Sequence, residues 1–231
     1  MEILLIRHAR PGWVADGRGV LDPALTPEGE AQAQHLGEAV HAWRRKPKTL
    51  WVSPAARARQ TAAPVARALG LEPVEHGWLE EIRLPPDWDG AAALDIRDHF
   101  ATARSRTEAQ WWAGIPGGES FHDFEARVTE NMAAALGALG IRRRQGAEAE
   151  APLYDLPEPD QVLAIVAHGG TNAVLTSYLL GLPMVPWAWE RFVTEHASVT
   201  RLRAAPLLGG HIFGLREHSD ANHVPGHLRS R

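Results

Sequence analysis

The sequence predicts an α/β fold, a three-layer α/β/α sandwich in which helices cover both faces of a mostly parallel central sheet. Short apolar runs, of the kind that form strands buried on both faces, alternate along the chain with segments of helical periodicity. That alternation is typical of parallel sheets with helical crossovers. The 231 residues can bury a large core, and 45% hydrophobic with 23% charged residues is ordinary globular usage. We therefore expect a single domain over residues 1–231.

The chain opens with a predicted strand, a helix and a second strand. Residues 2–6, EILLI, form an apolar run that suits a strand buried on both faces. Thr26 is placed to cap the following helix, and Pro27 suits its first position. Residues 49–53, TLWVS, predict the second strand.

A second helix follows, and the pattern then becomes less regular. Pro54 begins this helix and Gly70 ends it, after which residues 72–76 predict a weaker strand. From 83 to 118 the periodicity blurs and tryptophans stand among charged residues. We expect this region to form a lid or insertion over the sheet.

The C-terminal half restores the regular pattern. Residues 121–139 carry apolar side chains at helical spacing, whereas residues 142–160 predict an exposed loop. Residues 161–170, QVLAIVAHGG, contain a strongly marked strand and the start of another helix. Two later β-like runs, SVTRLR and HIFGLR, predict a hairpin at the edge of the sheet.

Charge and composition exclude several classes of function. The net charge is −4 and the basic residues are dispersed, so we expect neither nucleic acid nor a membrane surface as a partner. Cysteine is absent, which excludes disulfides, thiolate metal ligands and a cysteine nucleophile. No run approaches the roughly 18 apolar residues of a membrane span, so a cytoplasmic protein is the simplest expectation. Assembly into a homodimer stays open.

Basic and imidazole side chains follow three of the predicted strands. Arg7 and His8 come after the first strand, Arg57 after the second, and His168 with Gly169 after the strong late strand. Ligands of open α/β sheets lie outside the carboxyl ends of the strands, so these groups should share one crevice. Such a cluster would repel itself if empty, and a phosphoryl group is the matching ligand. Gly169 lets backbone N–H groups of the next helix approach phosphate oxygens.

These residues stand in motifs that resemble those of the histidine phosphatase superfamily, also called phosphoglycerate mutase-like. The resemblance extends from residue 4 to about residue 203, and ordered motifs are more specific than any single one. The matching segments, in family order, are LIRHA, LDPALTPEGEAQA, SPAARARQTA, LEEI, PGGES, VAHGG and ASVTRL.

The resemblance implies roles for five residues. It implies His8 as the nucleophile that becomes phosphorylated and Glu81 as the general acid. Arg7, Arg57 and His168 are implied to complete the phosphate pocket. Neighbouring guanidinium charges disfavour a protonated imidazole and stabilise the phosphoryl oxygens during transfer. The scheme requires neither a metal nor another cofactor, and its substrate is a small phosphomonoester.

The acid and the outcome of the reaction both have alternatives. Glu80 adjoins Glu81, and Asp89 is a third candidate for the acid. The rival functions are a phosphoglycerate mutase, which returns the phosphoryl group to a second hydroxyl, and a non-catalytic phosphate-binding module. The mutase branch has a distinctive basic, glycine-containing stretch just after the acid, where this sequence reads IRLPPDWDGAAALDI. The difference predicts a phosphatase whose less polar pocket mouth accepts larger or more hydrophobic phosphomonoesters.

Overall fold

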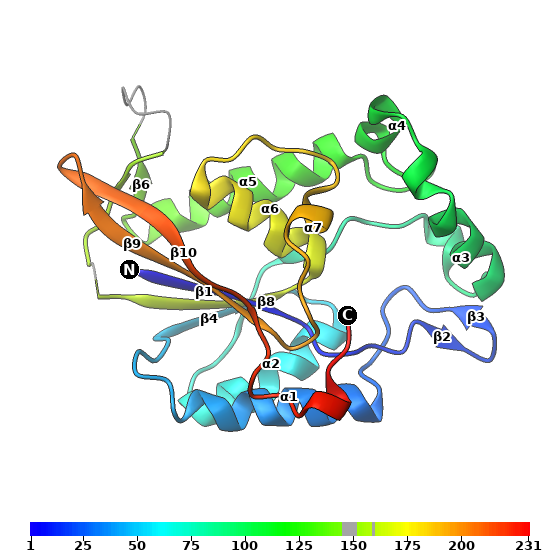
Figure 1. The fold of residues 1–231 in the computed structure, drawn as a ribbon, viewed down its shortest axis with the longest axis horizontal. Coiled ribbons are helices and arrows are strands. Elements are labelled where there is room, and N and C mark those ends of the chain that lie inside the picture. The colour runs from blue at the N-terminus through cyan, green and yellow to red at the C-terminus, as the bar shows by residue number, and fades with distance from the viewer. Residues whose placement is uncertain (145–151, 159) are drawn as a thin grey trace.

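A central sheet with helices on both faces organises the molecule. The structure, a computed structural model, describes residues 1–144, 152–158 and 160–231. The strands follow the order β5-β4-β8-β1-β9-β10-β7-β6, and helices lie above and below them (Figure 1). The predicted layered α/β architecture is therefore confirmed. Within the described ranges, no helix is long and apolar enough to cross a membrane.

One half of the sheet is parallel and the other half is antiparallel. The parallel strands are β5 (Val74–Glu75), β4 (Thr49–Val52), β8 (Val162–Ala167) and β1 (Glu2–Arg7). The antiparallel strands are β9 (Val199–Leu207), β10 (Gly210–Asp220), β7 (Tyr154–Asp155) and β6 (Arg142–Arg143). The two late runs form the expected hairpin, but β9 pairs with β1, so the hairpin lies inside the sheet.

The segment 142–160 differs from the exposed loop predicted for it. Its described ends form β6 and β7, and the Tyr154 ring is buried with its centroid 5.0 Å from that of Phe213. The charges and prolines around Tyr154 conceal this pairing in the sequence. Residues 145–151 and 159 lie outside the described residues.

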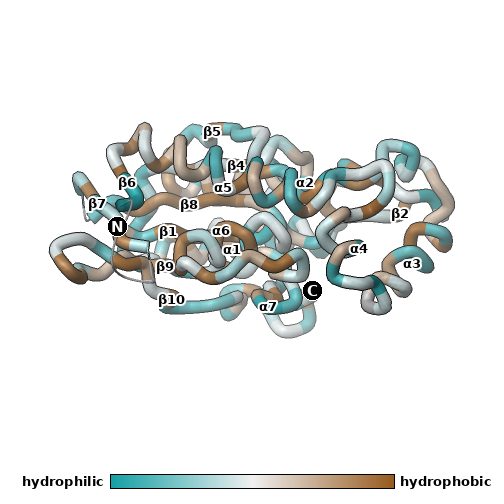
Figure 2. Tube along the Cα trace, turned by 90° about the horizontal axis from the view of Figure 1, so that it is seen from above, coloured by the Kyte–Doolittle hydropathy of each residue, from teal (hydrophilic) through white to brown (hydrophobic). Residues whose placement is uncertain are grey.

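Two helices cover each face of the sheet. They are α1 (Pro27–Val40) and α2 (Ala56–Leu69) on one face, and α5 (Phe121–Ala138) and α6 (Gly169–Leu180) on the other (Figure 1). Alternation along β1 explains both layers, because Leu4 and Ile6 pack toward α1 and α2 whereas Ile3 and Leu5 pack toward α5 and α6. Figure 2 shows β8 as a continuous hydrophobic run through the middle of the molecule.

Local signals in the sequence set the ends of these helices. The Thr26 hydroxyl accepts a hydrogen bond from the Gly29 N–H at 3.1 Å and caps α1. Gly70 and Gly181 end α2 and α6 in the left-handed conformation, with φ of 65° and 69°. Three further short helices are η1 (Gly77–Leu79), α7 (Ala188–Arg191) and η4 (Gly226–Leu228).

The region predicted as a lid forms short helices at one end of the molecule. They are η2 (Pro86–Trp88), α3 (Ala93–Ala101), η3 (Ala103–Ser105) and α4 (Glu108–Ala113), beside the hairpin of β2 (Val14–Ala15) and β3 (Arg18–Gly19) (Figure 1). The Gly19 N–H donates to the Ala91 carbonyl at 2.8 Å, and the Ala93 N–H donates to the Gly17 carbonyl at 2.9 Å. These bonds join the hairpin to the segment of η2 and α3, which we call the α3 region.

Helices α1 and α2 approach each other closely at Gly37. A β-carbon added to Gly37 would lie 2.7 Å from Pro64 Cβ and 3.0 Å from the Pro64 backbone. That is overlap with a rigid proline in a helix, not with the end of a flexible side chain. The glycine is therefore needed for the spacing of the two helices.

We predict that Gly37→Ala lowers the free energy of unfolding by about 1–3 kcal/mol, the usual cost of overpacking a core. Urea unfolding measures the change. Gly137→Ala is the matched control, because Gly137 is also helical and an added β-carbon there would meet no atom within 4 Å. We expect this control to be neutral or stabilising by up to about 1 kcal/mol. Equal stabilities for the two variants would contradict the packing argument.

Candidate active site

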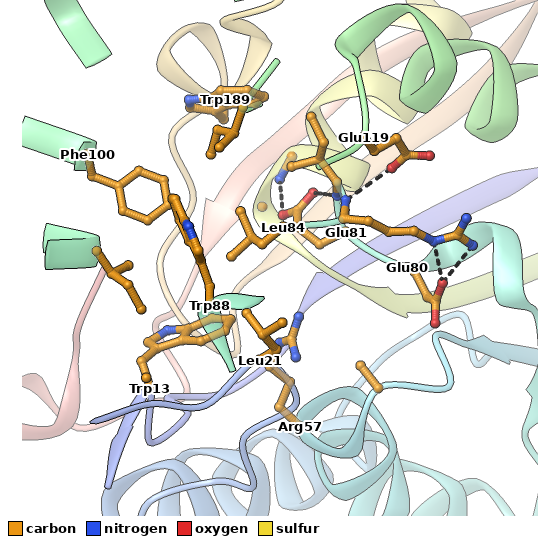
Figure 3. Close-up of a pocket in the computed structure, with 18 of the residues that line it drawn as sticks. Trp13, Leu21, Arg57, Glu80, Glu81, Leu84, Trp88, Phe100, Glu119 and Trp189 are labelled. Atoms are coloured by element: carbon orange, nitrogen blue, oxygen red, sulfur yellow. Dashed lines mark hydrogen bonds and ion pairs between the residues drawn. The ribbon is translucent and has the colours of Figure 1, made fainter. Parts of the chain in front are cut away.

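A cavity lies between the carboxyl ends of the parallel strands and the α3 region. Its volume is about 1180 Å³. Figure 3 shows apolar side chains on one side, among them Trp13, Trp88 and Phe100, and carboxylates on the other, among them Glu80 and Glu119. Five of the six residues predicted for the site line this cavity: Arg7, His8, Arg57, Glu81 and Gly169.

His8 follows β1 and is held in one tautomer. Its N–H continues the strand pairing by donating to the Ala167 carbonyl at 2.9 Å, and its ring is only 3% exposed. Nδ1 lies 2.8 Å from the Ala9 carbonyl oxygen. A carbonyl only accepts, so Nδ1 carries the proton and Nε2 keeps its lone pair. The nitrogen that can attack an electrophile is therefore Nε2.

Arg7 is held from behind by the loop that precedes β9. Its guanidinium donates to the Thr194 carbonyl and, at 3.2 Å, to Nε2 of His196. The Nε atom of Arg7 is buried and has no partner among the described residues. A buried cationic N–H without an acceptor is costly, so this position suits an anionic ligand.

Arg57 lies in the first turn of α2 and repeats this arrangement. It is 5% exposed, and its Nε is also buried without a partner among the described residues. One terminal nitrogen lies 3.5 Å from Asp22 Oδ1, a long contact that leaves donor capacity free. The guanidinium lies over the Trp13 ring, 4.8 Å from its centroid. This geometry is a cation–π contact.

His168 lies behind the cavity wall. It is fully buried and does not line the cavity, and its ring centroid is 5.1 Å from that of His8. Its Nε2 lies 2.8 Å from Ser53 Oγ, whereas its Nδ1 is buried without a partner among the described residues. The structure thus brings His168 beside the His8 ring but not to the cavity surface.

Gly169 begins α6 and offers a backbone donor. The first N–H groups of a helix have no partner inside the helix. Here the N–H groups of Gly170 and Thr171 donate to the Glu81 carboxylate at 2.8 and 3.1 Å. No partner for the Gly169 N–H occurs among the described residues. A helix N-terminus with a free N–H is suited to a phosphate oxygen.

The three candidate acids have different surroundings. Glu81 lines the cavity at the start of α6, whereas the Glu80 carboxylate is paired with Arg83 at 2.9 Å. Asp89 accepts a hydrogen bond from the Leu21 N–H at 3.1 Å and so ties the α3 region to the segment that follows β3. Among the three, only Glu81 lies on the helix start that also carries the free Gly169 N–H.

Two neighbouring features fix the position of Glu81. Arg127 donates to the carbonyls of Trp78, Glu80 and Glu81 at 3.0–3.3 Å, and it pairs with Glu119 at 2.7 Å. This gives the arginine that follows the PGGES motif a structural role. The second feature is the absence of a side chain at Gly170, where a β-carbon would lie 2.4 Å from Glu81 Oε1.

His196 belongs to the site although no motif singled it out. Its Nε2 accepts the hydrogen bond from Arg7, so its Nδ1 carries the proton and faces Ser230 Oγ at 2.9 Å. The His196 ring centroid is 5.7 Å from that of His8. The available signal was a histidine just before the late strand, whose antiparallel pairing with β1 places it beside Arg7. Among the described residues, no three histidine or acidic side chains converge as metal ligands.

Three imidazoles at the site are neutral for the same reason. Burial, reinforced by His168 and Arg57, holds the pKa of His8 well below its usual value. Burial, followed by the charges of Arg57 and Arg7, likewise keeps the pKa of His168 well below its usual value. For His196, burial and the charge of Arg7 lower the pKa to about 3. Imidazoles beside buried guanidinium groups are thus uncharged near neutral pH.

We predict that acid destabilises the protein from about pH 6.5 downwards. In the unfolded chain each histidine binds a proton near pH 6.5, whereas His8, His168 and His196 stay unprotonated when folded. The unfolded state then binds more protons, so stability is fully present above pH 6.5 and falls as pH decreases. The contribution of each histidine to the slope rises below pH 6.5 and approaches about 1.4 kcal/mol per pH unit.

Urea unfolding between pH 6.5 and pH 5 measures this slope. His196→Asn is the matched variant, since an amide can also accept from Arg7 but does not titrate. We expect it to reduce the slope by the share of one histidine. An unchanged slope in this variant would show that His196 is protonated in the folded state.

Comparisons with known proteins identify the family of the chain. The model of the histidine phosphatase superfamily (branch 1) matches residues 3–206. The glucosyl-3-phosphoglycerate phosphatase of Mycobacterium tuberculosis (strain CDC 1551 / Oshkosh) is 31% identical over 190 residues, which cover 80% of this chain and 78% of that protein. The corresponding phosphatase of Mycolicibacterium vanbaalenii is 29% identical, with 80% and 77% covered.

Solved structures show the same relationship. The complex of the mycobacterial glucosyl-3-phosphoglycerate phosphatase with inorganic phosphate matches with a TM-score of 0.69 and 27% identity, covering 97% of this chain and 99% of that one. The α-ribazole phosphatase of Shigella flexneri shares the fold with a TM-score of 0.70 at 22% identity, covering 96% and 97%. The family match spans nearly the whole chain, and the relatives are phosphatases. The chain belongs to the histidine phosphatase superfamily and is a phosphomonoester hydrolase.

Proposed function

We propose that the chain hydrolyses a small phosphorylated metabolite through a phosphohistidine on His8, with Glu81 as acid and base and without a metal ion. The observation that carries the proposal is a neutral imidazole with a free Nε2, set beside two guanidinium groups. The Nε atoms of Arg7 and Arg57 are buried without partners among the described residues. A dianionic phosphoryl group supplies the acceptors that these donors lack.

In the first step the phosphoryl group moves from the substrate oxygen to His8. The Nε2 lone pair attacks phosphorus, and the bond between phosphorus and the ester oxygen breaks. Glu81, in its protonated form, gives its proton to the leaving oxygen, which departs as an alcohol. Arg7, Arg57 and the Gly169 N–H stabilise the charge on the phosphoryl oxygens.

In the second step water releases the phosphoryl group. The Glu81 carboxylate takes a proton from a water molecule, whose oxygen attacks phosphorus as the bond to Nε2 breaks. Inorganic phosphate leaves, and the proton returns Glu81 to its starting form. Ser53 contacts the His168 ring and holds it beside the His8 ring. Both residues thus support the reaction without lining the cavity.

The size of the cavity bears on the substrate. Its volume of about 1180 Å³ is somewhat above the usual range of small-molecule sites, and it leaves room for a leaving group well beyond the phosphoryl group itself. The named activity of the mycobacterial relatives, glucosyl-3-phosphoglycerate phosphatase, supports a substrate of comparable size. The compound in that name is one candidate substrate to test, together with other phosphorylated metabolites.

Trapping the intermediate tests the proposal. We expect ³²P-labelled phosphomonoester, quenched in alkali after milliseconds, to label the wild-type protein with an acid-labile, alkali-stable phosphoryl group. His8→Ala should abolish the label and lower kcat by at least about 10³-fold, because the nucleophile is lost.

Two controls make the trapping experiment decisive. His8→Ala must keep the wild-type circular dichroism spectrum, so that lost activity is not lost folding. EDTA should leave wild-type turnover unchanged, since arginines carry the charge stabilisation. Full activity of a folded His8→Ala protein, or loss of activity in EDTA with recovery on adding metal, would refute the proposed mechanism.

We predict a leaving-group dependence for Glu81→Gln. Turnover of alkyl phosphates should fall about 10²–10⁴-fold, whereas p-nitrophenyl phosphate, whose leaving group needs little protonation, should lose much less. Glu80→Gln is the matched control, because that carboxylate pairs with Arg83 and lies on the same cavity. If Glu80→Gln gives the leaving-group pattern and Glu81→Gln does not, the acid has been misassigned.

A further inference from the structure

Helix α3 carries an apolar face that the rest of the protein covers only in part. Ala93, Ile96 and Phe100 stand one and two turns apart on the helix, and all three line the cavity. No residue of α3 is buried. An amphipathic helix of a globular protein normally packs this face onto the core, so here the face is exposed toward the active-site cavity instead.

Exposed apolar side chains gather around the same cavity. Phe100 is 48% exposed and Trp13 42%, and Val14 and Val193 are also exposed on the cavity lining. A cluster of exposed apolar side chains rimmed by polar groups marks a ligand-binding surface. Single exposed apolar residues elsewhere need no such explanation.

Contacts between the α3 region and the β2–β3 hairpin hold the apolar wall of the cavity in place. Gly19 allows α3 to pack onto the β2–β3 hairpin, because a β-carbon there would lie 2.4 Å from the end of the Ile96 side chain and 3.1 Å from the Trp88 carbonyl. The rings of Trp88 and Phe100 meet edge to face, with centroids 5.6 Å apart. Trp13 faces them from the hairpin side (Figure 3) and also stacks on Arg57. The apolar wall therefore adjoins the phosphate position.

Two arginines on the lining of the cavity are paired with carboxylates. Arg83 pairs with Glu80 at 2.9 Å, and Arg97 with Asp98 at 3.3 Å. These pairings reduce the attraction of the cavity mouth for a second anionic group on the substrate.

We propose that this cavity selects phosphomonoesters whose leaving alcohol carries an apolar ring, seated against Trp13, Trp88 and Phe100. The inference rests on the proposed function, since it assigns the leaving-group side of the same cavity. The phosphoryl group lies at Arg7, Arg57 and His8, and the ring covers the exposed face of α3. Burying the ring replaces water on both surfaces and lowers KM.

Two primary alkyl phosphates test the selection. 3-Phenylpropyl phosphate and glycerol 1-phosphate release alcohols of similar chemistry, so a difference between them reports binding of the leaving group. We expect kcat/KM to be about tenfold or more higher for 3-phenylpropyl phosphate, mainly through KM, because burying a phenyl ring is worth at least one factor of ten in binding.

A matched pair of α3 variants locates the effect. Phe100→Ala should raise KM for 3-phenylpropyl phosphate about five- to tenfold and change glycerol 1-phosphate turnover by less than about twofold. Leu94→Ala is the control, because Leu94 is 62% exposed on the same helix but does not line the cavity. It should change neither substrate.

The remaining outcomes separate this inference from the proposed function. Equal kcat/KM for the two substrates, with His8 still labelled, would overturn the ring selection and leave the mechanism standing. No His8-dependent phosphate release from either substrate would overturn both. If α3 instead packs on a second copy of the chain, Phe100→Ala would change the sedimentation coefficient and leave both KM values unchanged, which would also overturn the selection.

Discussion

Two buried guanidinium groups beside a neutral imidazole set the constraint on which the rest of the structure depends. Arg7 lies at the end of β1 and Arg57 at the start of α2, so the parallel half of the sheet brings their charges together. Burial is tolerable because backbone and neutral partners accept their outer N–H groups, Thr194 and His196 for Arg7. The same burial keeps the His8 imidazole uncharged, as the proposed nucleophile requires. One arrangement thus accounts for both the proposed anion site and the proposed nucleophile.

The carboxylate at the start of α6 is the second half of that arrangement. Glu81 accepts from two of the first N–H groups of the helix, and the Gly169 N–H has no partner among the described residues, so in the proposed mechanism one helix N-terminus serves both the acid and the phosphoryl group. This requires the chain before Ile82 to approach the helix backbone. Gly170 permits the approach and Arg127 holds it. A substitution at either residue would move the acid without touching the nucleophile.

The sequence predicted the site residues that follow strands or stand in motifs, and it missed the site residue that lies in a loop. His8 and Arg57 follow apolar runs, and their convergence follows from the rule for parallel strands. Glu81 stood beside Glu80 with nothing local to separate them, because the distinction depends on which carboxylate reaches α6. His196 lies in a loop, where no periodicity points to a site. The ends of segment 142–160 joined the sheet because Tyr154 found an apolar partner in Phe213, a contact between distant residues.

The α3 region shows why an apolar helical pattern does not by itself predict that the apolar face is buried. Ile96 and Phe100 have the spacing of a core-facing helix, yet the short helix sits beyond the sheet, where no layer remains to cover it. An exposed apolar face stabilises the fold less than a buried one would. The hydrogen bonds around Gly19 hold the helix to the β2–β3 hairpin and offset part of this loss. The scaffold therefore separates two tasks. The strand ends hold the residues proposed for phosphoryl transfer, whereas the wall proposed to meet the leaving group belongs to an appended unit. On this proposal, changes in α3 alter which alcohol is accepted without moving His8, Arg7 or Arg57.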